Sequence, residues 1–111
     1  MRDNSPASRS ILYHAARELD HEGYHSVRIA GSTRQFDLIA WNGETILFIA
    51  VRRARSGGIS RFSEDVSHLA ELASGNTLPG LVYIWIFIFR QWYRYRIMPG
   101  GAIPVREGAP L

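Results

Sequence analysis

The stretch FDLIAWNGETILFIAVR, residues 36–52, carries the strongest structural signal in the chain. Two runs of mainly aliphatic and aromatic residues, Phe36–Trp41 and Glu44–Arg52, flank the dipeptide Asn42-Gly43. Asn-Gly between two such runs is typical of a β-hairpin closed by a two-residue turn. The sequence therefore predicts two antiparallel strands joined at Asn42-Gly43.

A two-residue turn at this position also fixes which residues face each other. It pairs Asp37 with Phe48 and makes Ala50 the diagonal neighbour of Asp37. Because side chains two residues apart share a face, Asp37, Ala50 and Arg52 are expected on one side of the sheet. A carboxylate there, beside a basic loop, suits a metal-dependent phosphodiesterase, although the metal would usually need a second carboxylate.

The rest of the chain predicts helices and strands around this hairpin. The expected elements are a helix starting at Ser5-Pro6 and ending near Gly23, a strand Tyr24–Ala30, a helix capped by Ser60 and ending near Ser74, a strand Leu81–Phe89 and a strand Trp92–Met98. Both faces of the run from Leu81 to Phe89 are apolar, so this strand should be central and covered on both sides. We expect one α/β domain over residues 1–98, a mixed sheet flanked by helices in the order α-β-β-β-α-β-β. The tail 99–111, rich in glycine and proline, is expected to be loosely ordered.

Length and composition narrow the class of protein. The 111 residues suffice for one hydrophobic core, and the lack of cysteine excludes disulfides, thiolate metal sites and cysteine nucleophiles. The longest apolar run has nine residues, Leu81–Phe89, whereas a membrane-spanning helix needs about 20. The first residues, Met1–Pro6, lack the apolar segment of a signal peptide. We therefore expect a cytoplasmic protein with no membrane partner.

The basic residues are unusual in kind. All thirteen are arginine, and the formal net charge is +3. A GC-rich genome would explain this bias without any functional role. The bias nevertheless excludes catalytic lysine, while arginine offers bidentate contacts to phosphate.

A family resemblance emerges from the order of several short motifs. A Gly23-Tyr24 step is followed by a strand containing Arg28, a turn at Gly31-Ser32, Asp37 and the hairpin described above. This order resembles the archaeal Holliday-junction resolvases of the PD-(D/E)XK nuclease superfamily, over most of the chain and as far as about Ile97. The resemblance implies a restriction-endonuclease-like fold, DNA as partner, a homodimer and, in an active enzyme, Mg²⁺ as cofactor.

Position by position, the resemblance implies a depleted catalytic site. Asp37 matches the metal-binding aspartate and is treated as a vestigial catalytic residue that binds metal weakly or not at all. Ala50 stands where the second acidic ligand belongs, and Arg52 where the catalytic lysine belongs. The first helix of the family usually adds a glutamate, and Leu12 lies at about that place, although Glu18 is nearby in sequence. Ser32 matches the serine of the glycine-serine turn. No cofactor is therefore expected.

Two alternatives would account for the missing acid. An acidic residue on the second helix could have taken over the missing role, the candidates being Glu64, Asp65 and Glu71. Alternatively, Ala50 could replace a glutamate of the natural protein.

Three functions follow from this interpretation. The first is a catalytically degenerate nuclease relative that binds DNA, branched or duplex, through residues around the former site: Ser32, Arg34, Arg52, Arg53, Arg55 and Arg61. The second is an active Mg²⁺-dependent endonuclease with a relocated acid. The third is a homodimer that uses the fold only for protein interaction. For Arg52, Arg53 and Arg55 a solvated loop is an equally good interpretation. The homodimer is expected because so small a domain has little cover for the aromatic residues of the strand Leu81–Phe89.

Overall fold

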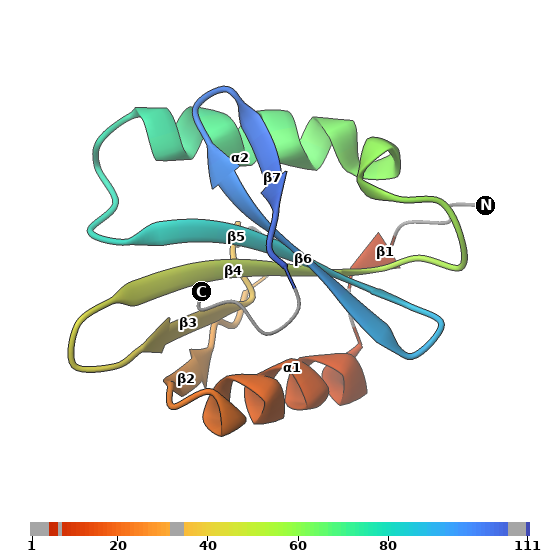
Figure 1. Cartoon of the computed structure of the whole chain (residues 1–111), viewed down its shortest axis with the longest axis horizontal. Coiled ribbons are helices and arrows are strands. Elements are labelled where there is room, and N and C mark those ends of the chain that lie inside the picture. The colour runs from red at the N-terminus through yellow and green to blue at the C-terminus, as the bar shows by residue number, and fades with distance from the viewer. Residues whose placement is uncertain (1–4, 7, 32–34, 107–110) are drawn as a thin grey trace.

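The computed structural model describes residues 5–6, 8–31, 35–106 and 111. In this part of the chain, seven strands form one mixed sheet that lies between two helices, α1 (Arg9–His21) and α2 (Ser63–Ser74) (Figure 1). The predicted architecture, a mixed sheet flanked by helices, is confirmed.

The order of strands across the sheet is β2-β3-β4-β5-β6-β7. The only parallel pair among these described strands is β4 with β5, which α2 connects. The short β1 pairs with the end of β4, beyond the point where β3 begins. The strand bounds are β1 Ser5–Pro6, β2 His25–Arg28, β3 Leu38–Trp41, β4 Ile46–Arg53, β5 Leu81–Ile88, β6 Gln91–Met98 and β7 Gly101–Pro104.

The start of the first helix differs from the prediction. Ser8 is the N-cap of α1, and its hydroxyl accepts a hydrogen bond from the backbone N–H of Ile11. Ser5 and Pro6 instead pair with Arg53 and Arg52 at the end of β4. A Ser-Pro pair fits a helix start locally, but here the backbone is extended and gives β4 a neighbour.

The hairpin between β3 and β4 exists, but its predicted register is wrong by two residues. Trp41 pairs with Ile46, and the loop has four residues instead of two. The cause is Asn42, whose side-chain Oδ1 accepts hydrogen bonds from the N–H groups of both Glu44 and Thr45. Because the shift is an even number of residues, every side chain stays on its predicted face.

Two other predicted boundaries need correction. Ser60 does not cap the second helix, because a 3₁₀ turn, η1 (Ile59–Phe62), precedes α2. The chain is not loosely ordered directly after Pro99, since Gly101–Pro104 form β7 and pair with β6. The sheet thus extends past residue 98. Residues 107–110 of the predicted tail lie outside the described residues.

The two helices cover opposite faces of the sheet (Figure 1). The side chains of α1 pack with Leu47, Ile49 and Val51 of β4, which are fully buried. On the other face the chain around α2 encloses Ala50 and Ile84. The prediction that β5 is central is confirmed, because Val82–Ile86 are at most 3% exposed.

This burial removes the reason given above for a homodimer. Most aromatic residues of β5 are already covered within one chain, including Tyr83 and Trp85, and only Phe89 beyond the end of the strand is strongly exposed.

Burial also raises the pKa of the Tyr83 phenol, whereas the positive charges of Arg96 and Arg94 act to lower it. Within the described residues, neither helix has the length and apolar character needed to cross a membrane.

Candidate functional site

Asp37, the acidic residue that the sequence indicates, lies where one edge of β4 has no strand partner. Strand β3 begins opposite Ile49, whereas β1 pairs with Arg52 and Arg53, so neither strand pairs with Val51. Asp37 lies just before β3, and its carboxylate Oδ2 accepts the Val51 N–H at 2.7 Å. A side chain thus takes the place of a strand partner at this point of the sheet.

The backbone holds Asp37 firmly in this position. Its N–H donates to the carbonyl of Ile49, and its carbonyl accepts from the N–H of Ile29, each at 2.9 Å. The residue is only 3% exposed. Its carboxylate also reaches Arg52, whose side chain shares a face of β4 with Ala50, so Asp37 and Ala50 lie on the same side of the sheet, as predicted.

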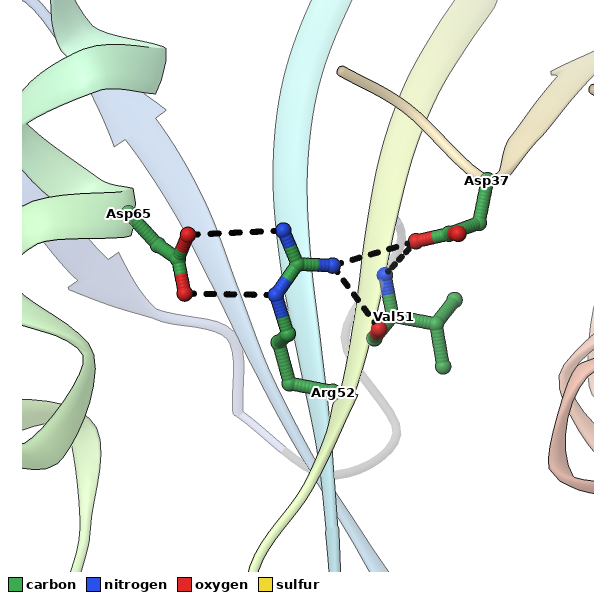
Figure 2. A network of polar contacts seen from close by, with 4 residues as sticks. All are labelled: Asp37, Val51, Arg52 and Asp65. Atoms are coloured by element: carbon green, nitrogen blue, oxygen red, sulfur yellow. Dashed lines mark hydrogen bonds and ion pairs between the residues drawn. The ribbon is translucent and has the colours of Figure 1, made fainter. Parts of the chain in front are cut away.

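Arg52 connects this carboxylate to the second helix (Figure 2). Its Nη1 lies 3.2 Å from Oδ2 of Asp37 and 2.9 Å from the carbonyl oxygen of Val51. On the other side, its Nε and Nη2 donate to the two carboxylate oxygens of Asp65, at 3.2 and 3.4 Å. The guanidinium therefore lies between two carboxylates and offsets one of their two negative charges.

The three side chains of this network become less exposed to solvent from α2 toward the sheet. The side chain of Asp65 is 34% exposed, that of Arg52 is 21% exposed and that of Asp37 is 5% exposed. The ion pair with Asp37 is thus shielded from water, whereas the pair with Asp65 is open to solvent and to competing anions.

The donor set does not fit a divalent cation while Arg52 holds this position. Ala50 offers no ligand and is fully buried in the core cluster that includes Phe62 and Ile84. The guanidinium brings a positive charge to within hydrogen-bonding distance of Asp37, which disfavours a metal ion at that oxygen. The described residues contain no group of three histidine or acidic residues that could hold a metal.

Of the three acids proposed as replacements, only Asp65 reaches this site. The side chains of Glu64 and Glu71 are exposed and form no hydrogen bond or ion pair with any described residue. Leu12, at the approximate place of the helix glutamate, is buried in the core on the α1 face. The sequence does not single out Asp65 among the three acids, because an ion pair across thirteen residues leaves no periodic signal.

The remaining predicted DNA-binding residues differ in their surroundings. Ser32 and Arg34 lie outside the described residues. Arg53 and Arg55 are exposed, and neither forms an ion pair within the described part of the chain. Arg61 lies against the loop after β4, where a Cβ on Gly57 would come within 2.1 Å of its Cδ. The glycine at position 57, with a φ of +85°, thus makes room for the aliphatic part of Arg61.

A solved structure of known function shares this arrangement of elements. It is that of Hjc from Archaeoglobus fulgidus, a Holliday junction resolvase from an archaeal hyperthermophile. The two superpose with a TM-score of 0.61 over 93% of this chain and 91% of that chain, at 20% sequence identity. The chain has the fold of an archaeal Holliday-junction resolvase. The resemblance noted from the motifs is thereby confirmed at the level of the fold.

No protein-family model matches the chain, and no curated protein matches its sequence. This resolvase-like fold is therefore recognised through its structure and through the order of its motifs. The arrangement of Asp37, Arg52 and Asp65 is a property of this chain's own residues.

Proposed function

We propose that this protein binds DNA through arginines around Asp37 and does not hydrolyse it. The observation that carries the proposal is the position of Arg52, whose guanidinium contacts both Asp37 and Asp65. A guanidinium between the two carboxylates offsets one of their two negative charges, and its own positive charge opposes a metal ion at the same oxygens.

The chemistry of arginine supports binding over catalysis. A guanidinium stays protonated at any physiological pH, so Arg52 cannot take a proton from a water nucleophile. Arg53 and Arg55 follow it in sequence and are exposed, with no carboxylate partner in the described residues. These two side chains are available for phosphate contacts, each of which would release a counterion and make binding depend on salt.

The proposal is tested by measuring DNA binding and DNA cleavage in parallel. Fluorescence anisotropy with a labelled duplex and a labelled four-way junction should give affinities that fall steeply with salt, and binding should persist in EDTA because it needs no Mg²⁺. Arg53→Ala and Arg55→Ala should each lower the slope of log affinity against log salt by about 1. The unmodified protein should leave both DNAs intact in Mg²⁺ or Mn²⁺.

A second candidate is a Mg²⁺-dependent endonuclease in which Asp65 replaces the missing acid. The observation that favours it is that Asp65 and Asp37 share one cation, Arg52, and so lie on either side of the same guanidinium. This candidate requires Arg52 to leave its position when metal and DNA bind. Efficient cleavage that disappears in Asp65→Asn would support it against the first proposal.

We also propose a homodimer, on a different surface from the one the sequence indicated. Helix α2 packs mainly on β5, β6 and β7, whereas the same side of β2 and β3 carries Val27 and Trp41, 49% and 37% exposed. Val27 pairs with Ile39, and Trp41 with His25, so these apolar side chains share one face at the edge of the sheet. An exposed apolar face of this kind is a candidate interface between two copies of the chain.

A further inference from the structure

The turn between β5 and β6 has an unfavourable backbone conformation. Ile88 and Gln91 form the last pair of the hairpin, so Phe89 and Arg90 are the two turn residues. Their φ angles are +49° and +64°. A turn with two positive φ angles strongly favours Asn-Gly, and a bulky aromatic residue is costly there. Backbone strain of this kind is found preferentially at functional sites, which makes this turn a candidate binding site.

The turn presents an aromatic ring to solvent. Phe89 is 79% exposed, more than any other large hydrophobic residue in the described chain. The strands β5 and β6 behind it are joined by seven residue pairs. The rings of Phe87 and Trp92 also pack against each other, with their centroids 4.8 Å apart. The exposed ring thus stands at the end of a rigid support, which limits the conformational entropy lost when a ligand stacks on it.

A groove borders Phe89, and its lining includes further aromatic side chains. It has a volume of about 310 Å³. Tyr93, which is 43% exposed, contributes a second aromatic side chain. The other side of the groove is the glycine-rich end of the basic loop, so backbone as well as rings borders the space. Its lining includes Gly57, Gly58, Ile88, Phe89, Tyr93 and Tyr95.

Positive charge lies on the other side of the same turn. Arg90 borders a second groove together with Arg53 and His14, and neither arginine forms an ion pair within the described residues. One carboxylate, Glu18, also borders this groove. Arg55 adds charge in the loop that leads to Gly57 and Gly58. Aromatic rings flanked by unpaired arginines are the combination that proteins use to bind unstacked nucleic-acid bases and their phosphates.

We propose that the Phe89-Arg90 turn binds an unstacked base of DNA, as found at a branch, bulge or single-stranded end. The base stacks on Phe89 and enters the groove beside Tyr93, while Arg90 and Arg53 contact the adjacent phosphates. This inference rests on the proposed DNA binding and specifies its substrate class: DNA with unpaired bases is bound more tightly than continuous duplex. The complementary charge of the two arginines favours DNA over a second copy of this basic chain as the occupant of the turn.

Affinity for two matched DNA probes tests the proposal. The probes are a duplex and the same duplex with an unpaired bulge that contains 2-aminopurine, whose fluorescence reports stacking. Phe89→Ala should weaken binding to the bulged probe by about tenfold, since stacking on an aromatic residue contributes on the order of 1–3 kcal/mol per base. Binding to the continuous duplex should change by less than about twofold, because it depends on phosphate contacts. The 2-aminopurine signal seen with the unmodified protein should disappear in the variant.

A turn replacement separates function from folding. The double variant Phe89→Asn with Arg90→Gly installs the residues that this backbone prefers, so it should raise Tm by several degrees and still lose the preference for the bulged probe. Tyr13→Ala, which removes another strongly exposed aromatic ring, from α1, is the matched control and should bind both probes normally.

Three outcomes would overturn the inference. If Phe89→Ala binds both probes as the unmodified protein does, the turn takes no base, although duplex binding would leave the proposed function standing. If the variant instead changes only the oligomeric state in sedimentation experiments, the turn is an interface between copies. If the unmodified protein binds neither probe, the inference and the proposed function both fail.

Discussion

Nη1 of Arg52 lies 3.2 Å from Oδ2 of Asp37, the same oxygen that accepts the N–H of Val51 at 2.7 Å. One carboxylate oxygen thus serves both as counterion to the arginine and as acceptor for a backbone group that no neighbouring strand satisfies. Leaving that N–H without an acceptor in the interior would cost about 1–3 kcal/mol. Asp37 therefore has a structural role in this sheet that requires no metal ion.

Substitutions at Asp37 should separate these two roles. Asp37→Asn keeps an acceptor for Val51 but loses the charge that compensates Arg52, whereas Asp37→Ala loses both. We expect Asp37→Ala to lower the free energy of unfolding by about 3 kcal/mol and Asp37→Asn by about half as much. Urea denaturation measures both. Equal losses in the two variants would show that the charge matters and the Val51 contact does not.

Ala50 offers a direct test of the missing metal ligand. Ala50→Glu places a second carboxylate on the same side of the sheet as Asp37, and Arg52→Lys in addition would replace the guanidinium. Because Ala50 is fully buried, the glutamate must displace core side chains, and without metal we expect a loss of about 2–4 kcal/mol in the free energy of unfolding.

Binding of Mn²⁺ should restore part of the stability that Ala50→Glu loses. Thermal unfolding and calorimetric titration should show Mn²⁺ binding to Ala50→Glu, and tighter binding when Arg52→Lys is added. Ala50→Gln has the same size without the charge and should respond no more than the unmodified protein. A strong Mn²⁺ shift in the unmodified protein would contradict the view that Ala50 disables the metal site.

The sequence predicted the fold because its signals were local. Alternation in β3 and β4, the two apolar faces of β5 and the helical spacing in α1 each follow from neighbouring residues. The errors have equally specific causes. Asn42 widened the hairpin through its side chain, and Pro6 joined a strand because the end of β4 lacked a partner. Neither effect can be deduced from residue propensities alone.

For the candidate site, the sequence predicted which residues share a face of the sheet but not their contacts. Motif order identified Asp37, Ala50 and Arg52, and strand alternation placed them on one face. The ion pair between Arg52 and Asp65 depends on how α2 lies over the sheet, and the gap at Val51 depends on where two strands end. Both are tertiary features.

Tyr83 should make the protein sensitive to alkaline pH. Burial raises the pKa of its phenol above that in the unfolded chain, so the folded state retains the proton over a range where the unfolded state releases it. Stability from this group is complete below about pH 10 and falls as the pH rises through the raised value. Tyr83→Phe should flatten this decline in urea denaturation followed from pH 9 upward. An unchanged slope would mean that other groups cause the alkaline loss.

The proposed homodimer can be tested at the edge of the sheet. Trp41→Glu introduces a charge on the exposed apolar face that also carries Val27, and it should convert the dimer to a monomer at micromolar concentration in light scattering. Ile103→Glu, at another exposed apolar position on β7, is the matched control and should remain dimeric. A monomeric unmodified protein would remove this proposal and leave the DNA-binding proposal unaffected.

Asp65 distinguishes the two candidate functions most sharply, because they predict opposite effects of one substitution. If the protein binds DNA without cleaving it, Asp65 competes with phosphate for Arg52. Its side chain is 34% exposed, so Asp65→Asn should cost less than about 1 kcal/mol of stability.

Releasing Arg52 should then strengthen DNA binding. We expect affinity to rise several-fold and the slope of log affinity against log salt to steepen by up to about 1, as for one added phosphate contact. Glu64→Gln, which removes a neighbouring charge from α2 that has no partner among the described residues, is the matched control. It should raise affinity less, since it acts only through long-range charge.

If Asp65 is instead the relocated catalytic acid, the same substitution should abolish Mg²⁺-dependent cleavage that the unmodified protein performs and Glu64→Gln preserves. A nicking assay on a four-way junction, run with the same preparations as the anisotropy titrations, decides between the two functions. Cleavage lost in Asp65→Asn would assign the chain to the active endonucleases. Tighter binding with no cleavage by any variant would assign Asp65 the role of an internal competitor that DNA phosphate displaces from Arg52.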